Sequence, residues 1–124
     1  MIYYFAYGHN TNTAVMKGRI PGAVCVGPAI LPHHKLVMAQ YAAVVKAKGH
    51  VAGVLWKISK EDLKTLDHYE EVYTHHRVRV KVNGVPHMAY VYYMNPGPWW
   101  HRPPSPTYVD HVAQGYAEHR LEAR

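Results

Sequence analysis

An Asn-Gly pair at positions 83 and 84 places the strongest constraint on how this 124-residue chain folds. The pair lies between two runs rich in β-branched and aromatic residues, 74–82 and 85–94. Asn-Gly is typical of a two-residue hairpin turn because both residues tolerate the positive φ angles that this turn requires. The sequence therefore predicts an antiparallel hairpin. In its first run, valines alternate with the basic residues Arg77, Arg79 and Lys81. This alternation indicates a strand with a solvated face and a core face.

Further apolar runs predict strands elsewhere in the chain. They lie at positions 2–6, 23–31, 35–45 and 49–59, with a turn at 32–34 between the second and the third. The first run does not alternate between apolar and polar residues, so this strand is expected to be buried on both faces.

Capping residues predict a middle helix and a C-terminal helix. Ser59 is followed three residues later by Asp62, which is the spacing of a capping box, and the helix is expected over 59–71. Ser105 as N-cap and Pro106 at the first helical position start the C-terminal helix. One face of that helix carries Tyr108, Val112, Tyr116 and His119 at helical spacing.

A short helical turn is also expected near the N-terminus, with Thr11 or Thr13 as its N-cap, running through Lys17 and closed by Gly18. The chain therefore has more predicted strand than helix. We expect an α+β fold with a curled, barrel-like sheet and flanking helices, as one domain over residues 1–124.

Composition narrows the class of protein. The net charge is +6, but the basic residues are scattered along the chain, so we expect no nucleic-acid partner. No apolar run is long enough to span a membrane, and the first run lacks a basic flank and a cleavage site, so no membrane partner is expected. The single cysteine, Cys25, excludes an internal disulfide and favours a cytoplasmic location.

Metal and thiol chemistry find little support in the sequence. The chain has eleven histidines, and four of them form the adjacent pairs His33-His34 and His75-His76. Neighbours on a strand point to opposite faces, so neither pair can readily chelate one ion, and we expect no metal site. Cys25 lies within an apolar run and is expected to be a buried, inert thiol.

One carboxylate continues an apolar stripe. Leu63 and Leu66 define the buried side of the middle helix, and Glu70 follows on the same side at its last turn. Burial and the negative end of the helix dipole would both raise the proton affinity of Glu70 toward the range of a general acid or base. In the alternative interpretation the helix ends at Tyr69, and Glu70 turns to solvent or pairs with Arg77.

The stretch Tyr7-Gly8-His9-Asn10 interrupts the first strand, and two interpretations are open for it. It is either an ordinary turn or a backbone cradle in which glycine lets N–H groups approach an anionic ligand. The adjacent Trp99 and Trp100, in a proline-rich loop, likewise suit either a lid over a site or a clamp on the core.

Four stretches, in order, resemble the γ-glutamylcyclotransferase-like family, which includes γ-glutamylamine cyclotransferases and AIG2-like proteins. They are YFAYGHN, MKGRIPGAVCVGPAIL, VAGVLWKISKEDLKTLDHYEE and PPSPTYVDHVAQGY. The resemblance implies a small mixed β-barrel with flanking helices. It also implies an activity, in which a small-molecule γ-glutamyl substrate closes to 5-oxoproline and the attached amine is released. This reaction needs no cofactor.

The same resemblance implies roles for individual residues. The catalytic glutamate of the family falls on Glu70. The substrate-binding positions fall on Tyr7, Gly8, His9, Asn10, Tyr73 and Tyr108. His75 is an alternative to Tyr73, because the segment after Glu70 is shorter than is usual in the family.

Two departures from the family pattern bear on function. His9 replaces the usual serine, and Glu71 replaces the usual glycine after the catalytic glutamate, where a second carboxylate would raise the proton affinity of Glu70 further. A noncatalytic small-molecule binding protein on the same fold is therefore the alternative function. A basic nucleic-acid-binding module is a third, and steep salt dependence of oligonucleotide binding would identify it.

Overall fold

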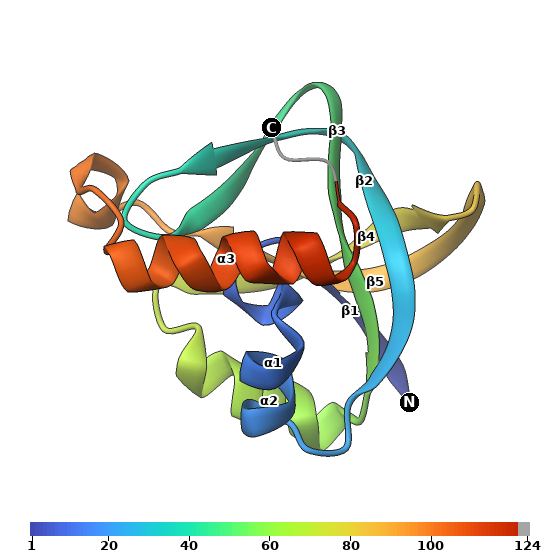
Figure 1. The fold of residues 1–124 in the computed structure, drawn as a ribbon. Coiled ribbons are helices and arrows are strands. Elements are labelled where there is room, and N and C mark those ends of the chain that lie inside the picture. The colour runs from blue at the N-terminus through green and yellow to red at the C-terminus, as the bar shows by residue number, and fades with distance from the viewer. Residues whose placement is uncertain (122–124) are drawn as a thin grey trace.

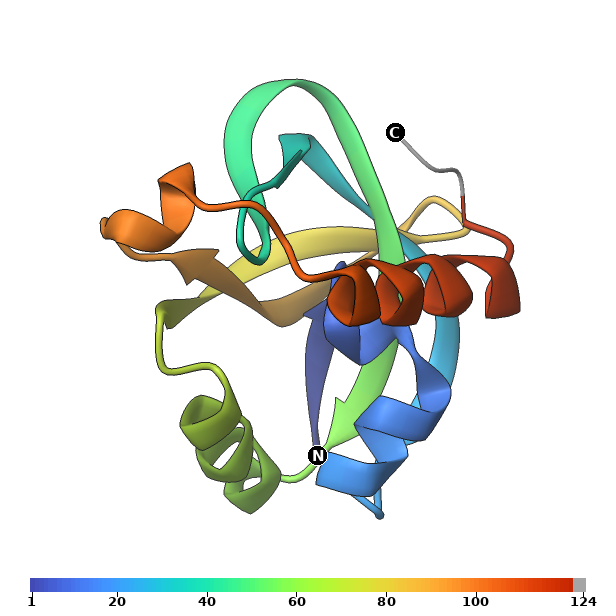
Figure 2. The same ribbon diagram turned by 60° about the vertical axis from the view of Figure 1, so that its left-hand side comes forward.

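The computed structural model describes residues 1–121 as one sheet with helices packed against it (Figure 1). The elements follow in the order β1 (Ile2–Ala6), η1 (His9–Thr11), α1 (Thr13–Arg19), β2 (Val24–Met38), β3 (Ala42–Ile58), α2 (Lys60–Tyr69), β4 (Tyr73–Val82), β5 (Val85–Met94), η2 (Pro98–His101) and α3 (Pro106–Glu118). The helices α1 and α2 flank the N-terminal end of β1, and α3 crosses above them (Figure 2).

The sheet is mixed and closes on itself. Its strand order is β1-β3-β2-β4-β5, and neighbouring strands in this order are antiparallel. The ring is completed by a parallel pairing of β1 with β5 through Tyr4 and Tyr90. The expected α+β fold with a curled, mixed sheet is therefore confirmed.

Strand β1 is buried on both faces, as its sequence predicts. Phe5 is fully buried and packs in a cluster to which all five strands contribute. Tyr4 is 4% exposed and packs on the other side, with residues such as Met16 of α1 and Leu66 of α2. The loop that follows β1 therefore starts in the interior of the molecule, between the two hydrophobic clusters that pack on the two faces of the strand.

The course of the chain between residues 23 and 59 differs from the prediction. The expected turn at 32–34 is instead a bulge inside β2, where the register shifts between Pro32 and His34 and His33 has a φ of 63°. A bulge bends a strand without reversing it. The reversal occurs at residues 39–41, inside the run that was expected to be one strand, so β2 and β3 form a single long hairpin.

The predicted turn and caps are otherwise largely confirmed. Asn83 and Gly84 have φ angles of 49° and 79°, as a hairpin turn of this type requires. Ser59 and Asp62 form the capping box of α2, and the Ser105 side chain caps α3. The expected cap of α1 is wrong. The side chain that accepts from the backbone, in this case from Val15 N–H, belongs to Asn12, and α1 runs on to Arg19.

Helix α3 packs directly against the loop after β1. A Cβ atom at Gly115 would lie 2.2 Å from Thr11 Oγ1 and 2.6 Å from the Asn12 nitrogen, so only glycine allows this approach. The Tyr116 hydroxyl donates to the Tyr7 carbonyl oxygen over 2.7 Å, and Asn12 Nδ2 donates to the His111 carbonyl oxygen over 3.0 Å. These contacts hold the loop after β1 against α3.

The fold bears on two further expectations, for Cys25 and for the two tryptophans. Cys25 is exposed rather than buried, because the first residues of β2 lie at the surface, although the partial burial that remains raises the pKa of its thiol. Trp99 and Trp100 both donate to the Asn95 carbonyl oxygen and pack with the cluster that contains Met94. Both tryptophans thus pack on the core, as the clamp interpretation expects, and the lid interpretation stays a prediction.

Within residues 1–121, no helix is both long and apolar enough to cross a membrane.

Candidate active site

A cavity of about 360 Å³ lies where the loop after β1, the end of α2 and the start of α3 meet. Its lining residues are Tyr4, Tyr7, Gly8, His9, Asn10, Arg19, Tyr41, Ala42, Tyr69, Glu70, Glu71, Val72, Tyr73, Tyr92 and Tyr108. All seven residues that the sequence singles out as catalytic or substrate-binding are among them, and their roles stay predictions. His75 does not line the cavity and instead contacts Asp67, with 2.8 Å between His75 Nδ1 and Asp67 Oδ1.

Glu70 combines features of both interpretations of the sequence. Helix α2 ends at Tyr69, as in the alternative, and the Glu70 N–H still bonds to the Leu66 carbonyl oxygen over 2.9 Å. The Glu70 side chain nevertheless faces the cavity and is only 14% exposed. Its cationic neighbour is Arg19, at 3.7 Å, and not Arg77.

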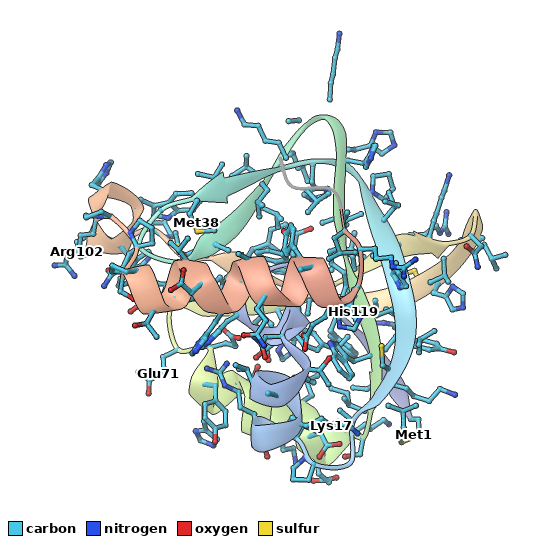
Figure 3. The ribbon with its side chains drawn as sticks, viewed as in Figure 1. Met1, Lys17, Met38, Glu71, Arg102 and His119 are labelled. Carbon is cyan, nitrogen blue, oxygen red and sulfur yellow. The ribbon has the colours of Figure 1, made fainter. Side chains whose placement is uncertain are left out.

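Near neutral pH the Glu70 carboxyl is divided between its protonated and its ionised form. Burial raises the pKa of its carboxyl to about 7, while the positive charge of Arg19 and a hydrogen bond from Asn10 Nδ2 oppose this rise. A carboxyl with this pKa can both accept and donate a proton at neutral pH. Glu71 is exposed at the edge of the molecule (Figure 3) and is not among the groups that set this pKa, contrary to expectation.

Asn10 is the side chain that holds Glu70 in place. Its Nδ2 donates to Glu70 Oε1 and to the Tyr4 hydroxyl, each over 3.0 Å, and its Oδ1 accepts from Arg19 over 2.9 Å. Its carbonyl oxygen accepts from Trp56 Nε1 over 3.1 Å. Asn10 is 2% exposed, and with both Nδ2 hydrogens engaged its side chain has no donor left for a ligand.

Arg19 is a site residue that the sequence reasoning missed. It lies at the end of α1, with its guanidinium carbon 4.7 Å from the ring centroid of Tyr69. It donates to Asn10 Oδ1 and lies beside Glu70 and His9. A buried carboxylate needs a nearby cation, so the inward position of Glu70 was the signal that could have pointed to Arg19. The chain has many basic residues, however, and the sequence does not show which of them lies close to Glu70 in space.

The loop that lines the cavity has backbone N–H groups without an acceptor in the described part of the chain. A Cβ atom at Gly8 would lie 2.9 Å from the Ala42 Cβ and 3.3 Å from the Tyr108 hydroxyl, so glycine is needed for this close approach. No residue among 1–121 accepts a hydrogen bond from the backbone N–H of Gly8, His9 or Asn10. These donors are available to an anionic group in the cavity.

Tyrosines form rigid, neutral walls. The Tyr7 hydroxyl donates to the Tyr92 carbonyl oxygen over 2.7 Å, and the Tyr73 hydroxyl donates to the Ala42 carbonyl oxygen over 2.6 Å. The Tyr108 hydroxyl accepts from the Ala42 N–H over 2.9 Å. Burial raises the pKa of Tyr108 to about 12 and that of Tyr7 and Tyr73 well above the ordinary value, so all three stay protonated at neutral pH.

No group of three or more histidine, cysteine, aspartate or glutamate side chains in the described part of the chain is arranged to hold a metal ion.

Solved structures similar to this chain share its fold. One named gamma-glutamyl cyclotransferase superposes with a TM-score of 0.87 at 29% identity, covering 97% of this chain and 80% of that chain. An uncharacterized protein from Homo sapiens gives the same values. An AIG2-like protein from Mus musculus gives 0.66 at 23% identity, covering 81% and 82%, which shows the fold alone.

Comparison with curated proteins yields no match. The sequence model of the family described as gamma-glutamyl cyclotransferase, AIG2-like, matches residues 4–113, which is most of the chain. This chain therefore belongs to the gamma-glutamyl cyclotransferase, AIG2-like family.

Proposed function

We propose that this protein is a γ-glutamyl cyclotransferase that converts a γ-glutamyl amine or γ-glutamyl amino acid into 5-oxoproline and releases the amine. One observation carries the proposal. One cavity is lined both by a buried glutamate whose pKa lies near neutrality and by a loop whose N–H donors have no acceptor among residues 1–121. The 29% identical gamma-glutamyl cyclotransferase structure supports the same assignment.

In the proposed reaction Glu70 moves protons between two nitrogens. Its carboxylate takes a proton from the α-ammonium group of the substrate, and the freed nitrogen attacks the γ-carbonyl carbon to close the ring. The α-nitrogen gives up two protons in all, and the leaving nitrogen gains two as its bond to the γ-carbon breaks. Glu70 therefore ends as the carboxylate that it was at the start, and no water is consumed.

Positioning supplies a large part of the proposed rate enhancement. The N–H groups of Gly8 and His9 would hold the α-carboxylate of the substrate, so that its α-amine lies close to its own γ-carbonyl carbon and to Glu70. Such fixation of an intramolecular reaction can lower its barrier by roughly 7–11 kcal/mol at most. A cavity of about 360 Å³ is of the size that small-molecule sites have. No metal or organic cofactor enters this proposal.

The alternative is a noncatalytic binding protein for small molecules on the same fold. A binding protein would not need a carboxyl group that exchanges protons near neutral pH. The inward-facing Glu70 with its raised pKa therefore favours the enzyme. The single exposed cysteine is consistent with a reducing compartment, and a cytoplasmic location is part of this proposal.

The proposal is tested by incubating the protein with γ-glutamyl amines and γ-glutamyl amino acids, including γ-glutamyl-lysine, and measuring 5-oxoproline by mass spectrometry. We expect product from at least one of them, and the relative rates rank the leaving groups. Binding of these compounds near His9 without product would instead identify the binding protein.

A further inference from the structure

His9, which stands where the family usually has serine, is tied at both ring nitrogens. Arg19 Nη2 lies 3.2 Å from His9 Nδ1, and His111 Nδ1, on α3, lies 2.9 Å from His9 Nε2. The two ring centroids are 5.1 Å apart and the ring planes lie within 10° of each other, which is compatible with a bond between ring edges. His9 therefore connects α1 to α3 and has no ring nitrogen left for a ligand in the cavity.

The arrangement assigns a tautomer to each histidine. A guanidinium has only donors, so His9 Nδ1 must accept and carries no proton. The proton of the neutral His9 ring is then on Nε2, and it is donated to His111 Nδ1, which must accept in turn. The row runs from Arg19 through His9 to His111, with every donor facing an acceptor.

We propose that His9 and His111 form a proton-sensitive link that positions Arg19 beside Glu70, and that uptake of one proton by the pair breaks the link. A proton added at Nδ1 of either ring makes two donors face each other, between Arg19 and His9 or between His9 and His111. Its consequence for catalysis rests on the proposed function, with His111 as a positioning residue.

The surroundings of the pair support this reading of the geometry. The charged and titratable groups that face it are Arg19 of α1, Tyr108 of α3, whose ring centroid is 5.2 Å from that of His9, and, through Arg19, Glu70. Burial, Arg19 and His111 together lower the pKa of His9 to about 4, so His9 stays neutral at physiological pH. His111 is held in place by the bond from Asn12 to its carbonyl oxygen.

Two substitutions of His111 distinguish the effect of its hydrogen bond with His9 from the effect of its packing. His111→Ala removes the acceptor for His9 Nε2–H. His111→Asn places an amide oxygen at the position of Nδ1, which accepts the same bond but takes up no proton at mildly acidic pH. Gln114→Ala, at an exposed position of the same helix, is the matched control.

The first measurement needs no substrate. Nitrogen-15 NMR of the imidazoles is expected to show His9 protonated at Nε2 and not at Nδ1. Carbon-13 titration of the Glu70 carboxyl is expected to give a higher pKa in His111→Ala, because His9 loses its anchor on α3 and holds Arg19 beside Glu70 less firmly. The wild-type value is expected in His111→Asn and Gln114→Ala. His9 protonated at Nδ1 at neutral pH, or a Glu70 pKa unchanged in His111→Ala, would overturn the proposal.

The second measurement is 5-oxoproline formation as a function of pH. We expect His111→Ala to lower kcat/KM roughly tenfold, as for a displaced positioning group. His111→Asn should retain activity at neutral pH. On acidification both proteins lose activity as Glu70 is protonated, and wild type should lose more than His111→Asn because its link also breaks. Equal acid sensitivity of His111→Asn and wild type contradicts the link. Failure of the proposed function looks different, since wild type then makes no 5-oxoproline while the NMR results still support the link.

Discussion

Asn10 Nδ2 donates a hydrogen bond to Glu70 Oε1 over 3.0 Å, and this contact joins the loop after β1 to the residue directly after α2, 60 positions further along the chain. Arg19 completes the group, bonded to the other end of the Asn10 amide and 3.7 Å from the same carboxylate oxygen. Both neighbours favour the ionised form of Glu70, whereas burial favours the protonated form. The pKa near 7 results from these opposing effects. It can be tested by removing the charge of Arg19 and by measuring how the buried carboxyl makes stability depend on pH.

Removal of the Arg19 charge should shift the pH dependence of the reaction. In Arg19→Met the pKa of Glu70 rises, because the cation that lowers it is gone. Since the base must be ionised in the free enzyme, the acid limb of kcat/KM moves to higher pH. Arg19→Lys restores the charge but not the forked donor, so it should move the limb back only in part.

Arg77→Met is the matched control for this series, because Arg77 is exposed on β4 and is the partner that the sequence offered for Glu70. Profiles of kcat/KM against pH are the measurement. An acid limb that stays in place in Arg19→Met, or moves in Arg77→Met, would show that the pairing described here does not govern Glu70.

The buried carboxyl should also make stability depend on pH. The folded pKa of Glu70, about 7, lies above the ordinary value of 4.5, so the folded state binds the proton more tightly than the unfolded state. This contribution to stability is fully present below about pH 4.5 and is lost as the pH rises through 7. The difference of 2.5 units corresponds to about 3 kcal/mol.

Glu70→Gln lacks this dependence. Its free energy of unfolding, relative to wild type, should therefore increase by about 3 kcal/mol between acidic and mildly alkaline pH, as measured by urea denaturation. Glu61→Gln, at an exposed position of α2, should follow the wild-type curve. Parallel curves for Glu70→Gln and wild type would mean that Glu70 is not desolvated in solution.

Contact between α3 and the loop should tolerate no side chain at Gly115. In Gly115→Ala the new Cβ meets Thr11 Oγ1 and the Asn12 nitrogen, and the helix must move, at a cost of about 1–3 kcal/mol in unfolding free energy. Because this loop carries the proposed carboxylate donors, activity should fall as well.

Gly18→Ala is the control for this prediction. A Cβ atom at Gly18 meets nothing within 4 Å, and the position lies inside α1, so alanine should stabilise the protein by about 0.5–1 kcal/mol. Thermal or urea unfolding measures both variants. A Gly115→Ala variant as stable as wild type, or more stable, would contradict the contact between α3 and the loop.

Local signals in the sequence predicted much of the fold. The turn at Asn83 and Gly84, the cap at Ser59 and the inward position of Glu70 each depend on residues a few positions apart. Such features are set by backbone preference and helical periodicity, which a single sequence displays directly.

Features that depend on contacts between distant segments were missed or misplaced. Arg19 meets Glu70 only because α1 and α2 pack on the same side of β1. The sequence predicts a turn where the structure has the bulge at His33, because proline and polar residues mark both. The surface position of Cys25 was likewise invisible, since an apolar run does not show where a strand leaves the core.

The most direct test of the proposed chemistry compares 5-oxoproline formation by wild type, Glu70→Gln and Glu61→Gln on the best γ-glutamyl substrate. Glutamine keeps the shape of Glu70 and its bond from Asn10 but cannot take a proton, so we expect kcat to fall by roughly 10²- to 10⁴-fold. Glu61→Gln should match wild type. Retention of wild-type kcat by a folded Glu70→Gln would contradict the assignment of Glu70 as the general acid and base.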